Sequence, residues 1–206
     1  MKMKILIITI GFILNMMAVT AQQPGTFRDT RDGKVYKTVV IGKQTWMAEN
    51  LAYKAGAGCW SYPEDDDFEE ESIFSNIKIF GYLYSWETAK KVCPAGWHLP
   101  TNEEWAILIK TLEGEKEAGY KMKSATGWKD NGNGSNESGF NALGGGNVYP
   151  QSGYENFDNI FKFGNWWSAS LENDLSRCFR VLYNSNNIFG MYEGPENGVS
   201  VRCIKD

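Results

Sequence analysis

Residues 129–165 are the part of this sequence that most restricts its fold. The segment KDNGNGSNESGFNALGGGNVYPQSGYENFDNIFKFGN is so rich in Gly, Asn and Ser that long helices and strands are not expected in it. Irregular segments of this length are uncommon in compact domains unless they are functional or disordered. Apolar side chains recur along it and favour order, so we predict an ordered surface loop that carries the function. These side chains are Phe140, Leu143, Tyr149, Tyr154, Phe157 and Phe161.

The first residues have the pattern of a secretory signal peptide. Lys2 and Lys4 precede a short apolar run, and small residues lead to a cleavage site after Ala21. The run is too short for a membrane span. We expect a secreted protein, located in the periplasm, on the cell surface or outside the cell. Its expected parts are a signal peptide at 1–21, a polar N-terminal segment at 22–33 and one domain at 34–206.

The net charge of the chain argues against two classes of binding partner. Cleavage removes two lysines and no acids, so the formal net charge changes from -4 to -6. Nucleic acids and anionic membranes need clustered Lys and Arg, and we expect neither as a partner.

Two helices are predicted in the middle of the chain. In residues 81–93, apolar or small side chains recur every three or four positions, and Pro94 and Gly96 end the helix. A second helix begins at Thr101, which has the spacing of a capping box with Glu104.

Short strands are predicted on both sides of these helices. Residues 34–47 have the pattern of a hairpin, and the segments WWSAS, RCFRVLY, NIFGMY and VSVRCIK alternate near the C-terminus. Strands at both ends without a repeated β-α-β order indicate an α+β fold.

The four cysteines indicate disulfides. No two of Cys59, Cys93, Cys178 and Cys203 lie within 20 residues of one another, whereas metal sites use close pairs such as C-x-x-C. In an exported protein such cysteines form bridges, and three pairings are open. The only histidine, His98, lies close to Cys93, but a bridged Cys93 is no nucleophile, so we interpret His98 as a structural residue and expect no catalytic residue.

An acidic run raises the question of calcium. Seven of the eight residues from Glu64 to Glu71 are acidic, and carboxylates are ligands for Ca²⁺. The run lacks the D-x-[DN]-x-[DN]-G spacing of a calcium loop and is more typical of a solvated loop. We therefore expect no cofactor and no metal, with Ca²⁺ as the alternative.

Five blocks in order resemble a known family: DGKVYKTVVIGKQTWMAENLAY, GYLYSWETAKKVCPAGWHLPTNEEW, GWKDNGNGSNESGFNALGGG, NWWSAS and GVSVRCIKD. The resemblance is to the Fibrobacter succinogenes major paralogous domain, common in secreted proteins of Bacteroidetes. It implies a C-type lectin-like fold, related to formylglycine-generating-enzyme-like domains, with two helices, short antiparallel sheets and a long irregular loop region. It also implies a Cys93–Cys203 disulfide, which leaves Cys59 with Cys178.

The fold that the resemblance implies does not decide between binding and catalysis, but the chain lacks a catalytic constellation. Aromatic faces stack on sugar rings, while amides and carboxylates bind their hydroxyls. We expect a secreted, non-enzymatic binding or adhesion domain that recognises an extracellular glycan or protein. The expected contact residues are Trp128, Asp130, Asn131, Asn133, Asn136, Tyr149, Tyr154 and Asn156. The alternatives are an oxidase of the formylglycine-generating type, which would bind copper through nearby cysteines, and a purely structural surface or matrix protein.

Overall fold

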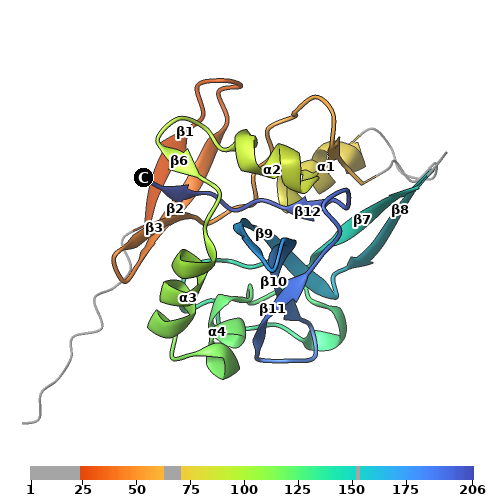
Figure 1. Ribbon diagram of the computed structural model, residues 1–206. Helices are drawn as coiled ribbons and strands as arrows, with labels where there is room; N and C mark the ends of the chain where they lie inside the picture. The colour runs from red at the N-terminus through yellow and green to blue at the C-terminus, as the bar shows by residue number, and fades with distance from the viewer. Residues whose placement is uncertain (1–23, 63–70, 152–153) are drawn as a thin grey trace, which may run out of the picture.

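The computed structural model describes residues 24–62, 71–151 and 154–206, which form three sheets and four α-helices (Figure 1). The expected signal peptide and residues 64–70 of the acidic run lie outside the described residues. The helices are α1 (Glu71–Phe80), α2 (Trp86–Val92), α3 (Asn102–Thr111) and α4 (Glu115–Met122), with a 3-10 turn at Lys129–Asn131. The strands are β1 (Pro24–Arg28), β2 (Val35–Ile41), β3 (Gln44–Met47), β4 (Cys59–Trp60), β5 (Leu83–Tyr84), β6 (Trp97–His98), β7 (Gly145–Gln151), β8 (Tyr154–Ile160), β9 (Phe163–Glu172), β10 (Leu175–Leu182), β11 (Ile188–Tyr192), β12 (Val199–Ser200) and β13 (Ile204–Lys205).

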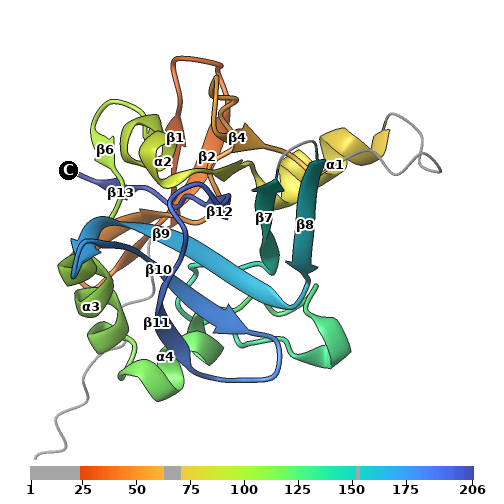
Figure 2. The same cartoon turned by 45° about the vertical axis from the view of Figure 1, so that its right-hand side comes forward.

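The sheets bring the two ends of the chain together. One sheet has the order β1-β2-β3-β13-β6 and the other β11-β10-β9-β12-β5-β4, so the last strands lie inside both. Strands β7 and β8 form a separate hairpin that projects beside α1 (Figures 1 and 2). Most pairs are antiparallel, and β12 runs parallel to β9. The predicted α+β class is confirmed, and strands predominate over helices.

Two sequence predictions of regular structure were incomplete. The fold has four described helices instead of two, because α1 and α4 join the expected α2 and α3. The segment predicted as irregular contains the β7–β8 hairpin, with seven residues in each strand. Backbone pairing and alternate apolar side chains such as Val148 and Phe157 stabilise these strands despite their Gly and Asn content.

The segment between α2 and α3 has the predicted structural role. Helix α2 ends before Cys93, and Thr101 with Glu104 forms the expected capping box of α3. Cys93 is bonded to Cys203, which ties the end of α2 to the residue before β13. The expected Cys93–Cys203 disulfide is therefore confirmed.

The second expected disulfide is wrong. Cys59 and Cys178 are free thiols on β4 and β10. Three strands, β9, β12 and β5, separate them in the sheet. At a strand spacing of about 4.8 Å the two positions are roughly 19 Å apart, beyond the reach of a disulfide.

A fully buried arginine connects the sheets to the long loop. Arg202 donates from Nε and Nη2 to Asn50 Oδ1, at 3.1 and 2.7 Å, and from Nη1 to the backbone carbonyls of Met47 and Phe140. Asn50 Oδ1 also accepts from Trp166 Nε1 at 2.9 Å. Burial lowers the pKa of Arg202 to about 9, so the guanidinium stays charged at neutral pH. One buried cation thus binds polar groups of β3, of Asn50 just after it and of the loop.

Replacing this arginine should destabilise the whole domain. Arg202→Met keeps a long side chain but leaves buried carbonyl groups without a donor, which costs about 1–3 kcal/mol for each group. We expect the free energy of unfolding, measured by urea denaturation, to fall by about 3 kcal/mol or more. An unchanged or higher stability would contradict this role for Arg202.

The stability of the fold should also depend on the charge of His98. Its ring nitrogens lie 2.8 Å from Glu104 Oε1 and 2.6 Å from Asp206 Oδ1. Partial burial opposes the charged form, but the hydrogen bonds to Asp206 and Glu104 outweigh burial and raise the pKa of His98. A raised pKa in the folded state stabilises the fold fully below the unfolded value of about 6.5, and this stabilisation is lost as the pH rises through the folded pKa.

We therefore expect His98→Gln to lower stability more at about pH 5.5 than at about pH 9. The groups are partly exposed, so the difference should be about 1 kcal/mol or less. Urea denaturation of both proteins at the two pH values measures it. An equal loss at both values would show that the charge of His98 contributes nothing.

Candidate functional site

The expected contact residues fall into two separate groups. Trp128, Asp130, Asn131, Asn133 and Asn136 belong to the loop after α4, whereas Tyr149, Tyr154 and Asn156 belong to the β7–β8 hairpin. The first segment contacts the residue just after the hairpin, because Lys129 N donates to Phe161 O at 2.9 Å. The structure therefore does not bring all eight residues to one surface.

Trp128 belongs to the core, so its predicted role as a contact residue is wrong. Its side chain is 5% exposed and packs in the main hydrophobic cluster. The indole Nε1 donates to Ser124 Oγ at 3.0 Å and to the Ala142 carbonyl at 3.2 Å. An indole buried and hydrogen-bonded in this way has no face free for a ligand.

The polar residues after Trp128 mainly shape their own loop. Asn133 Oδ1 accepts from the backbone N of Trp128 at 3.1 Å, and Asn136 Oδ1 accepts from the backbone N of Asn141 at 2.8 Å. Asp130 and Asn131 are exposed and have φ values of 51° and 57°, which Asn and Asp adopt more readily than most residues. These residues are common in such turns for this reason, independent of any ligand.

A buried lysine, Lys123, hydrogen-bonds to backbone carbonyls of this loop and of residues 182–185. Lys123 Nζ donates to the carbonyl oxygens of Gly132 at 2.7 Å, Ser185 at 3.0 Å and Leu182 at 3.2 Å. Burial lowers the pKa of Lys123, and the surrounding carbonyl oxygens favour the charged ammonium. The ammonium group is surrounded by carbonyl oxygens, much as a bound metal ion would be. The lysine side chain therefore fixes this part of the loop.

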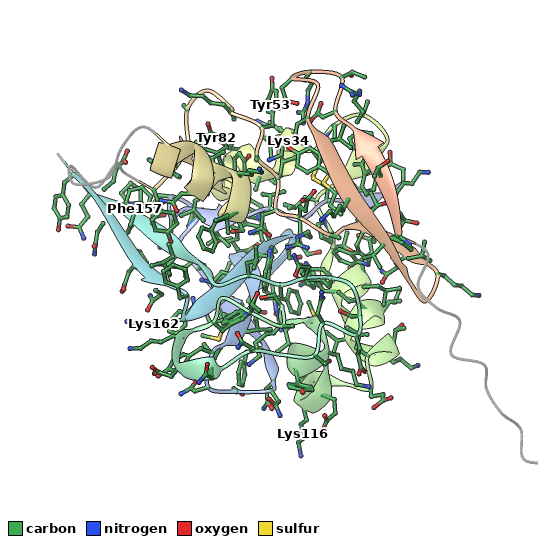
Figure 3. The ribbon with its side chains drawn as sticks, turned by 180° about the vertical axis from the view of Figure 1, so that it is seen from behind. Lys34, Tyr53, Tyr82, Lys116, Phe157 and Lys162 are labelled. Carbon is green, nitrogen blue, oxygen red and sulfur yellow. A yellow bond between two sulfur atoms is a disulfide. The ribbon has the colours of Figure 1, made fainter. Side chains whose placement is uncertain are left out.

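The β7–β8 hairpin has one apolar and one polar face. The rings of Phe157 and Tyr62 pack in a tilted arrangement at a centroid distance of 4.9 Å, and Figure 3 shows Phe157 at the hairpin on the side of α1. Tyr149 and Asn156 are paired in the register, and Tyr154 pairs with Gln151 at the end of the hairpin. Because side chains alternate along strands, Tyr149, Tyr154 and Asn156 share the other face.

Tyr154 is the most exposed aromatic residue of this polar face. Its side chain is 59% exposed, and its hydroxyl donates to Gln151 Oε1 at 2.9 Å. An exposed, oriented aromatic ring offers a stacking surface to a ligand. Tyr149 is half-buried, nearer the base of the hairpin.

A cluster of polar side chains lies at the base of this face. We call Asn147, Tyr149, Asn165, Arg180 and Glu193 the Arg180 cluster. Arg180 Nε donates to Asn165 Oδ1 at 2.6 Å, and Arg180 Nη2 lies 3.3 Å from Glu193 Oε2. Asn147 and Asn165 are buried, and Asn165 Nδ2 donates to the Gly146 carbonyl at 3.1 Å. The cluster joins β7 to β9, β10 and the residues after β11 (Figure 2).

The surroundings of Tyr149 raise its pKa. Burial raises this pKa, and the Glu193 carboxylate raises it further, while Arg180 and the Asn147 amide oppose the shift. The phenol is therefore protonated at neutral pH and available as a hydrogen-bond donor.

Sequence reasoning found Tyr149 but missed the other members of the cluster. Arg180 stands between Phe179 and Val181 in an alternating strand, and a charged residue within such a strand was the available signal. Asn147 and Asn165 carry no such signal, because Asn is common throughout residues 129–165.

Two cavities of the described residues lie beside the β9–β10 turn, and the lining of the second includes Glu193 of the Arg180 cluster. One of about 880 Å³ is lined by α3, α4 and the ends of β9 and β10, and its Glu172 and Arg177 form an ion pair with each other. A second of about 630 Å³ lies between Trp86 and the β9–β10 turn. Within residues 24–62, 71–151 and 154–206, no group of three or more His, Cys, Asp or Glu side chains could hold a metal ion.

A family model described as the Fibrobacter succinogenes major domain matches residues 39–205. The chain belongs to this family. The Fibrobacter succinogenes major domain thus extends from β2 to β13 and includes the disulfide, Arg202 and every member of the Arg180 cluster. No curated protein and no solved structure matches the chain. No helix within the part of the chain that the structure describes is long and apolar enough to cross a membrane.

Removing the buried ammonium should loosen the loop of this domain. Lys123→Met deprives the Gly132, Leu182 and Ser185 carbonyls of their common donor, and we expect a loss of about 2–4 kcal/mol in stability. Amide hydrogen exchange should become faster in residues 129–136 and 182–185. Lys116→Met on α4 is the matched control, because Lys116 is exposed and points away from the domain (Figure 3). Equal exchange in both variants would contradict the role of Lys123.

Proposed function

We propose that this chain is a secreted, non-enzymatic binding domain that attaches to an extracellular glycan. The proposed contact surface comprises the polar face of the β7–β8 hairpin and the Arg180 cluster at its base. The observation that carries the proposal is the combination, on one face, of an exposed aromatic ring with buried amides and a paired Arg and Glu.

The chemistry of this face suits a sugar. The ring of Tyr154 is a stacking surface for the apolar face of a pyranose. The Tyr149 hydroxyl, the Arg180 guanidinium and the Glu193 carboxylate are the donors and acceptors that ring hydroxyls need, and the buried Asn165 orients Arg180. Mutual hydrogen bonds hold these groups in place, which lowers the entropic cost of binding. An extracellular protein ligand is the alternative occupant of this surface.

The proposed fold is C-type lectin-like. The Cys93–Cys203 disulfide supports it, because it joins the end of a helix to the last strand as the family resemblance implies. The expected signal peptide supports export, and a disulfide suits an oxidising compartment. The protein would act in the periplasm, on the cell surface or outside the cell.

The placement of the free thiols argues against the oxidase alternative. A copper site of the formylglycine-generating type would need two neighbouring cysteines. Cys59 and Cys178 are separated by three strands, and burial raises the pKa of Cys178 to about 12, so this thiol is a poor nucleophile and a poor metal ligand at neutral pH. A structural matrix role would require self-association and no glycan ligand.

A glycan array tests the proposed function. We expect the folded chain to bind at least one saccharide and Tyr154→Ala to bind it about tenfold more weakly, because a stacking ring is lost. Tyr120→Ala is the matched control, since Tyr120 is 40% exposed on α4, away from the hairpin. Binding of no glycan by a folded protein, or equal binding by the two variants, would contradict the proposal.

A further inference from the structure

The cavity between α2 and the β9–β10 turn is bordered by half-exposed apolar side chains. Its volume is about 630 Å³, and we call it the turn cavity, defined by Trp86, Glu87, Leu171, Asp174, Leu175 and Tyr192. Leu171, Leu175 and Tyr192 are 48%, 52% and 49% exposed. Single exposed apolar side chains are common on protein surfaces, but several of them around one cavity are typical of a binding surface.

The turn holds the two leucines in place. Only Asn173 and Asp174 connect β9 to β10, and both have left-handed φ values, 52° and 61°. Positive φ at both central residues is the geometry of a type I′ turn, which closes a tight hairpin. Leu171 pairs with Ser176 in the register directly beside this turn. The apolar border is therefore formed before a ligand binds, which lowers the entropic cost of binding.

Most polar groups of the turn cavity already have hydrogen-bond partners. Ser176 Oγ donates to the Glu193 carbonyl, and both oxygens of the Glu193 carboxylate accept from other side chains. Trp86 is 8% exposed, and its Nε1 donates to a backbone carbonyl at 2.8 Å. Few groups remain for the many hydroxyls of a sugar, so the cavity suits a ligand with apolar surface better than a saccharide.

The charged side chains that line the turn cavity are acidic. They are Glu87, Asp174 and Glu193, and among the residues that the structure describes no Lys or Arg lines it. Arg180 neutralises Glu193, whereas the pair of Glu87 with Lys90 is exposed, and exposed ion pairs are weak. Asp174 is exposed at the turn and forms no ion pair within the same described residues. A cationic ligand therefore finds an unpaired carboxylate here.

Two further observations favour a cation. On the other side of the turn, the cavity of about 880 Å³ is lined by four Glu side chains but only one Lys and one Arg. Acidic side chains on both sides of the turn give a negative potential that attracts cationic ligands. Lys90 Nζ lies 3.8 Å from the centroid of the Trp86 ring, so an aromatic residue of the turn cavity already contacts one ammonium group.

We propose that the turn cavity docks a segment of a partner protein that carries an Arg or Lys side chain between apolar residues. The aliphatic stem of this side chain packs on Leu171 and Tyr192, and its cationic head lies near Asp174. The apolar neighbours in the segment cover Leu175. A saccharide offers nothing to the leucines, whereas such a segment matches both the apolar border and the acidic charge.

This inference does not rest on the proposed glycan function, because it concerns a second surface. Figure 2 shows β9 and β10 reaching α3 on one side of the molecule, whereas the β7–β8 hairpin lies beside α1. Glu193 is the residue where the turn cavity adjoins the Arg180 cluster.

An array of capped octapeptides tests the chemistry of the partner. Varied apolar residues surround one central position, which is Arg, Lys, Glu or Ser. We expect the best Arg peptide to bind the full chain about tenfold or more tightly than its Glu and Ser forms in calorimetry, and added salt to weaken it. Equal binding of the Arg and Glu forms, or binding of no peptide at millimolar concentration, would overturn the proposal.

Variants connect peptide binding to the turn cavity. Asp174→Asn removes the charge and keeps a residue type that adopts left-handed φ; Asp130→Asn is its control, because Asp130 is exposed with φ of 51°. Leu175→Ser removes an apolar contact, and Ile107→Ser on α3, at a position 50% exposed, is its control. Each turn variant should weaken the best Arg peptide about fivefold or more, and the controls should leave it unchanged. Thermal unfolding confirms that each variant is folded.

The outcomes separate this inference from the proposed function. Peptide binding that is lost in the turn variants and kept in Tyr154→Ala would support a separate surface. Peptide binding that is kept in both folded turn variants would overturn the inference and leave glycan binding intact. Saccharide binding that is lost in both turn variants would make the turn cavity a glycan site and would also overturn the inference.

Discussion

The buried guanidinium of Arg202 is the interaction on which the rest of the structure depends. It lies next to Cys203, which is bonded to Cys93, and it reaches Asn50 and the carbonyls of Met47 and Phe140. The C-terminal residues thereby connect the first sheet, the helix pair and the long loop. A charge without a hydrogen-bonded carboxylate is tolerated there because several carbonyl and amide oxygens solvate it. Removal of these contacts would leave the buried carbonyl oxygens of Met47 and Phe140 without their Arg202 donor.

Strand β9 connects this core to the candidate site. Trp166 donates to Asn50 on the inner side of the strand, while its neighbour Asn165 points to the other side and accepts from Arg180. Because adjacent side chains in a strand face opposite ways, the packing of Trp166 fixes the position of Asn165. Lys123 adds a second buried cation, which holds the loop beside the hairpin through carbonyl oxygens. The proposed binding face is therefore formed by the packed core, and its polar groups are oriented before any ligand arrives.

Sequence patterns predicted the local structure better than the contacts between distant segments. The helix signals around Cys93 and the capping box of Thr101 depend on neighbours a few residues away, and they were correct. The hairpin of β7 and β8 was missed because pairing between two strands, rather than the propensity of either, makes them regular. Trp128 was predicted as a contact residue because aromatic faces stack on sugars, but its indole is buried. The Arg180 cluster could not be predicted, since it assembles from β7, β9, β10 and the residues after β11, and sequence spacing does not report their proximity. The pairing of Cys59 with Cys178 failed for the same reason.

The central claim is that one face, formed by the hairpin and the Arg180 cluster, binds a saccharide. An amide NMR titration of the folded chain with oligosaccharides of the glycan array tests it most directly. The account predicts chemical-shift changes that concentrate at residues 147–149, 154–158, 165, 180 and 193. Changes that concentrate instead around the cavity between α3, α4 and the β9–β10 turn, or no changes at millimolar saccharide, would contradict it.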